Sequence, residues 1–225
     1  MEYTLSRKTR GFYPNNIIDD NILIYHSKNM QYLPGELQEE VLFSLKEPDD
    51  LFRVCSTSKG SRQVCSNPSF WREKFRRENL PLVEEGNNFT EWLRIYQKSL
   101  KTTQETDNII NSGDRISISL IEVPEPSMLG PLVKVAGIGQ LWKKTHESTN
   151  VTRLPGRVEI HRYFLKFHTK RNEKGYIWNL IDSVFVIPKN PYEEPQTYNI
   201  DGGSISTEDL WFIVYQLRYS GKNFY

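Results

Sequence analysis

Two histidines in the second half of the chain are the first candidates for chemistry. His161 and His168 are seven residues apart, in a run rich in aromatic and β-branched side chains, which is typical of a strand. Successive side chains of a strand point to opposite faces, so an odd separation places the two imidazoles on opposite sides. We therefore expect them not to share a metal ion. The carboxylates of Glu159 and Asp182 have no spacing that pairs them for acid–base catalysis.

The two cysteines, Cys55 and Cys65, are the next candidates. Zinc sites combine closely spaced cysteines with nearby histidines, and the sequence around these two positions offers neither arrangement. Two cysteines also cannot staple a chain of this length. We expect them to be small buried side chains on helices and not metal ligands.

A pair of glycines in Asp201-Gly202-Gly203 is the remaining candidate, as a phosphate-binding loop. Such loops follow a strand and carry further glycines or a Gly-Lys-Ser sequence, which are missing here. The segment predicts a turn instead. Because no nucleophile is paired with a base, the sequence favours a protein that is not an enzyme and needs neither a cofactor nor a metal.

Composition narrows the class of protein further. The chain has 225 residues, of which 37% are hydrophobic and 12% aromatic, enough for one medium domain or two small ones. Its net charge of +1 gives no long-range attraction to nucleic acid or to an anionic membrane. The N-terminus lacks the apolar run of a signal peptide, and no stretch approaches about 18 apolar residues. With so few cysteines, we expect a reducing compartment, the cytoplasm or the nucleus.

Residues 33–79 have the apolar periodicity of helices. Pro48 ends the first helix, Asp49 can cap a second, and Asn67-Pro68-Ser69 makes a turn that caps a fourth. A further helix is expected over residues 89–100. The apolar stripe of the first helix consists of Leu37, Val41, Leu42 and Leu45.

A basic cluster lies on the fourth expected helix. Glu73 and Glu78 are interleaved with it, so we expect a solvated helix face and not a phosphate site. The basic residues are Arg72, Lys74, Arg76 and Arg77.

Beyond this region the pattern changes from helices to strands. Alternating residues predict a strand over 116–120, and a second candidate is 132–136. The strongest signal is a hairpin with arms 158–168 and 176–187. Ser206 with Asp209 three residues later predicts the start of a buried C-terminal helix.

The fold class that follows is α+β, with four parts. These are an N-terminal arm over residues 1–30, a helical module over 31–100, a polar linker over 101–114, and a β-rich domain over 115–225 closed by a helix.

Residues 33–71 also contain a string of short motifs that is more specific than any of its parts. It runs from Leu33-Pro34-Gly35-Glu36-Leu37 through Pro48-Asp49-Asp50-Leu51 and Arg53-Val54-Cys55 to Asn67-Pro68-Ser69-Phe70-Trp71. This string resembles the F-box family, and its ending is similar to F-box-like proteins of large DNA viruses. The resemblance covers about a fifth of the chain.

The resemblance implies a three-helix module that binds the adaptor Skp1 of a cullin ubiquitin ligase, while a second domain captures a protein target. Many F-boxes place a Trp where the third helix begins, but Ser58-Lys59-Gly60-Ser61-Arg62 has no aromatic residue. The loss of a large anchor weakens an interface. The docking residues that the resemblance implies are Leu33, Pro34, Leu37, Val41, Leu42 and Leu51, with Val54 and Cys55 beside them.

These observations favour a protein-docking adaptor, and two alternatives remain open. The first is a structural or assembly protein, such as a virion component, that uses the helical module for packing. The second, less favoured, is a small hydrolase or nuclease in the C-terminal domain, which would require a pocket in which His161 or His168 converges with acidic groups. Adjacent aromatic residues of the hairpin, such as Tyr163 and Phe164, cannot enter one core. We therefore expect an aromatic surface that is open to a partner or covered by residues 1–30.

Overall fold

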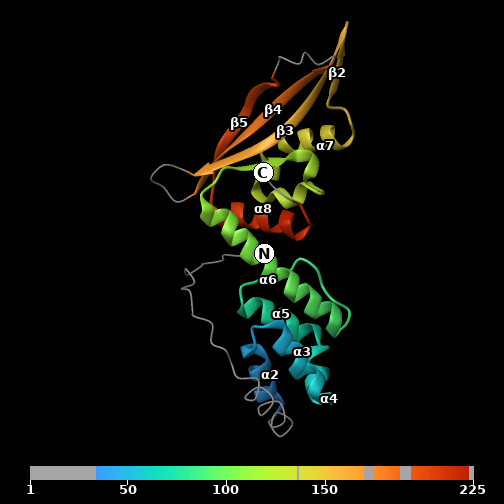
Figure 1. Cartoon of the computed structure of the whole chain (residues 1–225), viewed down its shortest axis with the longest axis vertical. Coiled ribbons are helices and arrows are strands. Elements are labelled where there is room, and N and C mark those ends of the chain that lie inside the picture. The colour runs from blue at the N-terminus through green and yellow to red at the C-terminus, as the bar shows by residue number, and fades with distance from the viewer. Residues whose placement is uncertain (1–33, 136, 170–174, 188–193, 223–225) are drawn as a thin grey trace. The chain divides into compact units, whose positions relative to one another are not determined.

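The computed structural model (Figure 1) describes residues 34–135, 137–169, 175–187 and 194–222. The chain divides into two compact units, residues 1–101 and residues 102–225. The first unit is helical, and the second combines an antiparallel sheet with helices. The predicted α+β class is therefore confirmed. The expected N-terminal arm, residues 1–30, lies outside the described residues.

Helices build the first unit, and local signals in the sequence set their ends. Proline occupies the first turn of both α3 and α5, where its missing N–H is not needed. The side chains of Ser58 and Asn67 accept backbone N–H bonds at the starts of α4 and α5. The helices are α2 (Gly35–Ser44), α3 (Pro48–Thr57), α4 (Lys59–Cys65), α5 (Pro68–Arg77) and the first part of α6 (Phe89–Ser112).

Aromatic side chains fill the core of this unit. The rings of Trp71 and Trp92 stack at 6.0 Å with an interplanar angle of 2°, and Phe75 and Tyr96 pack beside them. Trp71 Nε1–H donates to the carbonyl of Cys65 at 2.7 Å. The core therefore ties α5 and α6 to the end of α4.

The polar run that the sequence predicts to be a linker is helical in the structure. Residues 101–112 continue α6 without a break, so the predicted linker over 101–114 is wrong for most of its length. The run contains no proline or glycine before Gly113, whose φ of +69° ends the helix in the way that glycine favours. Thr102, Thr103 and Thr106 are buried. The polar composition of this run therefore gave no sign that one face of the helix is buried.

The second unit is built on one antiparallel sheet with the strand order β1-β3-β4-β5, in which β2 also pairs with β3. The predicted hairpin is confirmed as β3 and β4, and β1 lies within the predicted strand at 116–120. Neither β2 nor β5 was expected. The strands are β1 (Ile116–Ser119), β2 (Val151–Leu154), β3 (Arg157–Thr169), β4 (Tyr176–Ile187) and β5 (Gln196–Ile205).

Two predictions of local structure in this unit are wrong. Asp201-Gly202-Gly203 is not a turn but part of β5, where Gly203 lies opposite Trp178. A Cβ atom on Gly203 would lie 3.1 Å from Trp178 Nε1, so the glycine leaves room for the indole. The strand expected at 132–136 is wrong for its first part, because residues 132–134 end η3 (Pro126–Lys134), from which Leu132 packs into the core. Residue 136 lies outside the described residues.

Helices cover one face of the sheet and complete its core. Ser206 Oγ accepts the N–H of Asp209 at 3.0 Å, which confirms the predicted start of α8 (Thr207–Tyr219). α8 buries Leu210, Ile213 and Val214 in the same core as the inward residues of β3 and β4. The remaining helical segments are η2 (Leu120–Glu122) and α7 (Ile138–His146).

Candidate protein-docking site

The structure divides the eight predicted docking residues into a surface set and a core set. Pro34 and Leu37 are exposed, Leu37 by 52%, and Val41 is half-buried. Leu33 lies outside the described residues. The remaining four are buried in the core of the first unit: Leu42, Leu51, Val54 and Cys55.

The surface set lies along α2. Pro34 precedes the helix, and its carbonyl accepts the N–H of Leu37 at 3.0 Å. Leu37 and Val41 are four residues apart on the helix and so share one face. We call Pro34, Leu37 and Val41 the α2 row. Among the described residues of unit 1, Pro34 and Leu37 are exposed, whereas Val41 is half-buried and also packs against the core.

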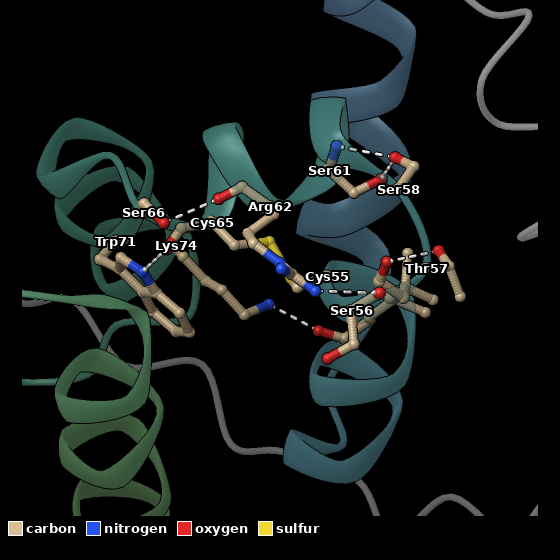
Figure 2. The surroundings of a disulfide bond; sticks show 12 residues. Cys55, Ser56, Thr57, Ser58, Ser61, Arg62, Cys65, Ser66, Trp71 and Lys74 are labelled. Atoms are coloured by element: carbon tan, nitrogen blue, oxygen red, sulfur yellow. Dashed lines mark hydrogen bonds between the residues drawn. A yellow bond between two sulfur atoms is a disulfide. The ribbon is translucent and has the colours of Figure 1, made fainter.

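The start of α4 lies beside α2. A Cβ atom on Gly60 would lie 3.5 Å from Gln38 Oε1. Ser58 Oγ caps α4 by accepting the N–H of Ser61 at 3.0 Å (Figure 2). This is the stretch in which the sequence lacks an aromatic anchor, and Lys59 and Gly60 are exposed there. The surface next to Gln38 is therefore formed without a large apolar side chain.

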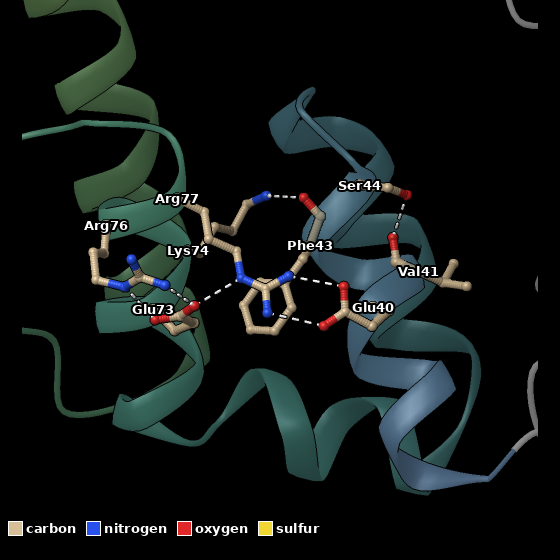
Figure 3. Close-up of polar contacts among 8 residues, drawn as sticks. All are labelled: Glu40, Val41, Phe43, Ser44, Glu73, Lys74, Arg76 and Arg77. Atoms are coloured by element: carbon tan, nitrogen blue, oxygen red, sulfur yellow. Dashed lines mark hydrogen bonds and ion pairs between the residues drawn. The ribbon is translucent and has the colours of Figure 1, made fainter.

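Lys74 of α5 fixes the C-terminal end of α2 (Figure 3). Its Nζ donates to the carbonyl of Leu45 at 2.5 Å and to Glu78 Oε1 at 2.8 Å, with a longer bond of 3.5 Å to the carbonyl of Phe43. Helix C-termini leave carbonyls without partners, and Lys74 supplies a charged donor. Tyr96 completes the network by donating its hydroxyl to Glu78 Oε2 at 2.7 Å.

The burial of Lys74 overturns the expectation of a wholly solvated basic cluster. Its side chain is fully buried, and this desolvation lowers the pKa of Lys74. The other members, Arg72, Arg76 and Arg77, are exposed and pair with carboxylates. A charge pattern alone does not show which member of a run turns inward.

Arg77 makes a second connection between α5 and α2. Its guanidinium donates two bonds to the carboxylate of Glu40, at 2.8 and 2.9 Å, and lies 4.0 Å from the ring centroid of Phe43. Phe43 in turn stacks on Phe70 at 4.8 Å. The α2 row is therefore carried by a helix that α5 positions through several contacts (Figure 3).

The two cysteines are bonded to each other, contrary to expectation. Cys55 of α3 and Cys65 of α4 form a disulfide with a Cα–Cα distance of 6.0 Å (Figure 2). Both are completely buried, as predicted. Their separation of 10 residues matched no zinc spacing, but the turn between the two helices brings them together. The disulfide adds a covalent link between α3 and α4.

Acid should destabilise the first unit, because its surface carboxylates are paired. Arg76 and Arg77 hold the pKa of Glu73 at about 2, below the ordinary 4.5, and Arg77 likewise lowers the pKa of Glu40. A depressed folded-state pKa stabilises the fold above the unfolded value and is lost as the pH falls toward the folded value. We expect the urea midpoint to drop between pH 4.5 and pH 2.

Glu73→Gln should make that drop smaller, since it removes the carboxylate with the largest shift. Glu39→Gln is the matched control, because Glu39 is exposed and makes no ion pair with a described residue. Added salt should also reduce the drop, because exposed pairs are screened. An equal acid sensitivity of both variants would show that the Glu73 pairs do not contribute.

Phe52 is an exposed aromatic residue that sequence reasoning did not single out. It is 53% exposed, and its ring centroid lies 6.2 Å from that of Phe89. The sequence did contain a signal for this exposure. Phe52 directly follows the buried Leu51 on α3, so it lies outside the apolar stripe that faces the core. It is an additional apolar surface of the first unit.

In the second unit, the structure brings together His161 and Asp182. Nδ1 of His161 lies 2.7 Å from Asp182 Oδ2, and its Nε2 lies 3.4 Å from Thr152 Oγ1. His168 projects from the other face of the sheet, as predicted. Sequence spacing missed the pair because only the β3–β4 register makes them neighbours. Asp182 holds the imidazole in a fixed orientation and links the two strands.

The described residues have two negative features that bear on the type of site. They contain no group of three or more His, Cys, Asp or Glu side chains that could hold a metal ion. None of the helices described is both long and apolar enough to cross a membrane.

Comparison with known proteins assigns part of the first unit to a known type of domain. The family model described as F-box-like matches residues 30–77. The chain therefore carries an F-box-like domain. The match contains all of α2, α3, α4 and α5, and it confirms the family resemblance of the motifs. Comparisons with curated proteins and with solved structures gave no match. An F-box-like domain is a protein-interaction module, so the α2 row belongs to a docking module and not to a catalytic one.

Proposed function

We propose that this protein is an adaptor that joins a Skp1-type subunit of a ubiquitin ligase to a protein target. The F-box-like domain binds the Skp1-type subunit, and residues 102–225 bind the target. The observation that carries the proposal is the F-box-like match over residues 30–77, within which Leu37 is 52% exposed. The protein acts through binding, without catalysis or a cofactor, in the cytoplasm or the nucleus. In these reducing compartments we expect Cys55 and Cys65 to be two buried thiols and not the disulfide of the structure.

The α2 row supplies the apolar part of the Skp1-type contact. Apolar side chains that a module leaves exposed side by side mark interaction sites. Pro34 and Leu37 are exposed at the start of α2, and the half-buried Val41 follows one turn later. The surface beside them lacks an aromatic anchor at Gly60. Since such anchors supply much of the energy of an interface, we expect a moderate affinity that depends strongly on the row itself.

Replacing Pro34 and Leu37 by Ala should weaken binding to a purified Skp1-type protein by about tenfold or more, because truncating an interface anchor typically costs about 2 kcal/mol. Isothermal titration calorimetry with the full chain measures the effect, and circular dichroism checks the fold. Leu82→Ala with Val83→Ala is the matched control, since these residues are exposed and apolar but follow the F-box-like match.

Unchanged binding by the Pro34/Leu37 variant would remove the α2 row from the interface. If the parent chain does not bind a Skp1-type protein at all, the adaptor proposal fails. Light scattering then tests the assembly alternative, which requires the parent chain to self-associate and the row variant to lose that association.

A further inference from the structure

The sheet of the second unit has two faces of different character. Tyr163, Leu165 and Phe167 of β3 point into the core, so the alternate residues point to the opposite side. We call that side the outer face. The strand register places Ile160 opposite Phe185 and Phe164 opposite Ile181 on it. Its central apolar residues are Val158, Ile160, Phe164, Ile177, Ile181 and Phe185.

Along β3 and β4 the outer face is largely apolar although no described helix covers it, and its six central residues are half-buried. Its β1 and β5 positions are Ser, Thr, Asn and Gly. The open face of an antiparallel sheet is normally polar. None of the six central residues belongs to the buried core or packs against it, whereas α8 and the start of α7 pack on the inward side. At its margin, Ile187 and Val151 are 49% and 40% exposed. The face is therefore an apolar surface without a partner among the described residues.

The charges on the outer face all have one sign. Arg153, Arg162 and Lys166 project from it, and the paired register places no Asp or Glu on the same side. Glu159, Asp182 and Asp201 alternate to the inward side. None of the three basic side chains forms an ion pair with a described residue. A chain of net charge +1 thus carries a local basic surface.

Arg162 is held on the apolar surface in a defined position. Its guanidinium lies 4.5 Å from the ring centroid of Phe185, a cation–π contact that keeps the charge on the face. An incoming carboxylate can therefore meet a preordered guanidinium. Apolar strips and a fixed cation side by side suit a ligand that offers both acidic and apolar groups.

We infer that the outer face binds an acidic segment of a partner protein that also carries apolar side chains. The inference rests on the proposed function and specifies the target that the adaptor captures. A second copy of the chain would place cations against cations. Residues 1–33 contain four basic and three acidic residues, so they are not complementary. Single-stranded nucleic acid would need exposed aromatic rings on which its bases could stack. Most of the central residues are aliphatic, and Arg162 covers one face of the Phe185 ring, so few rings are free for stacking.

Selection from a random peptide library displayed on phage, with the full chain as bait, tests the inference. We expect the selected peptides to be rich in Asp and Glu together with apolar residues. Arg162→Glu with Lys166→Glu should weaken the best peptide at least tenfold, because like charges then meet. Lys134→Glu with Lys144→Glu is the matched control, with the same change in net charge at exposed positions away from the outer face.

If the charge reversal disturbs the fold, the neutral variant Arg162→Gln with Lys166→Gln replaces it. This variant should also weaken binding of the same peptide. Peptides without acidic enrichment, or an equal loss in the control variant, would overturn the inference. So would displacement of the peptide by single-stranded DNA at equal strength, or binding that appears only when residues 1–33 are removed. Skp1-type binding should stay unchanged in all these variants, which separates failure here from failure of the adaptor proposal.

Discussion

Lys74→Met is expected to destabilise the F-box-like domain by about 3–5 kcal/mol, the usual cost of removing one partner from a buried ion pair. The side chain is fully buried and bonds both Glu78 and the carbonyl of Leu45. Methionine fills a similar volume, so the loss arises from unpaired polar groups and not from a cavity. Urea unfolding followed by circular dichroism gives the free energy.

Two further variants identify the origin of that loss. Lys74→Met with Glu78→Gln should recover part of the stability, because the carboxylate no longer lacks its cation. Arg72→Met should cost at most about 1 kcal/mol, since Arg72 pairs with Glu85 on the surface, where both side chains are 53% exposed. A Lys74 variant as stable as the Arg72 variant would mean that the buried network does not support the fold.

Trp178→Ala should destabilise the second unit by about 3–5 kcal/mol, because it removes a large buried side chain and leaves a cavity. Trp178 is 4% exposed, and β5 presents Gly203 opposite it. A glycine cannot fill the space that the indole leaves. Thermal unfolding of the full chain should show a lowered transition for the second unit.

Trp142→Ala is the comparison for Trp178, because Trp142 is a half-buried tryptophan of the same unit and should cost less. A Cβ atom on Gly203 would lie 3.1 Å from Nε1 of the Trp178 ring and 3.3 Å from two of its carbons. The larger Gly203→Val should therefore also destabilise, by about 1–3 kcal/mol. Equal costs for the two tryptophans would mean that the sheet core collapses around the missing indole.

Helix and hairpin signals in the sequence were local, and the structure bears them out where they were clear. Asn67 and Ser206 cap α5 and α8 as predicted, whereas Pro48 is the first residue of α3 and the expected Asp49 cap does not form. The β3–β4 hairpin followed from two long arms of β-branched and aromatic residues. These elements could be predicted because neighbouring residues alone determine them.

The parts that failed depend on distant neighbours. Residues 101–112 look like a linker by composition, yet Thr102 and Thr106 are buried by tertiary packing. Gly202 and Gly203 suggest a turn until Trp178 and Asn179 of the adjacent strand are placed against them. Local propensity gives way to such packing.

The docking site was only partly predictable from the sequence, because the burial of its residues also depends on tertiary packing. The motifs located the module, but only the fold separates exposed Pro34 and Leu37 from buried Leu42 and Leu51. Phe52 was overlooked because the family string does not name it. The His161–Asp182 contact required the strand register, which sequence spacing does not provide.

The dependence of α2 on α5 also fixes an order of events during synthesis. α2 has no side-chain cap at its start and no basic residue in its last turn, so little in its own sequence sustains a short helix. Its stabilising partners come later in the chain: Lys74 lies 29 residues after Leu45, and Arg77 lies 37 residues after Glu40. A nascent chain that ends before Arg77 therefore has the α2 row in its sequence but not yet on a stable helix. Partner capture by this row must wait until α5 has left the ribosome.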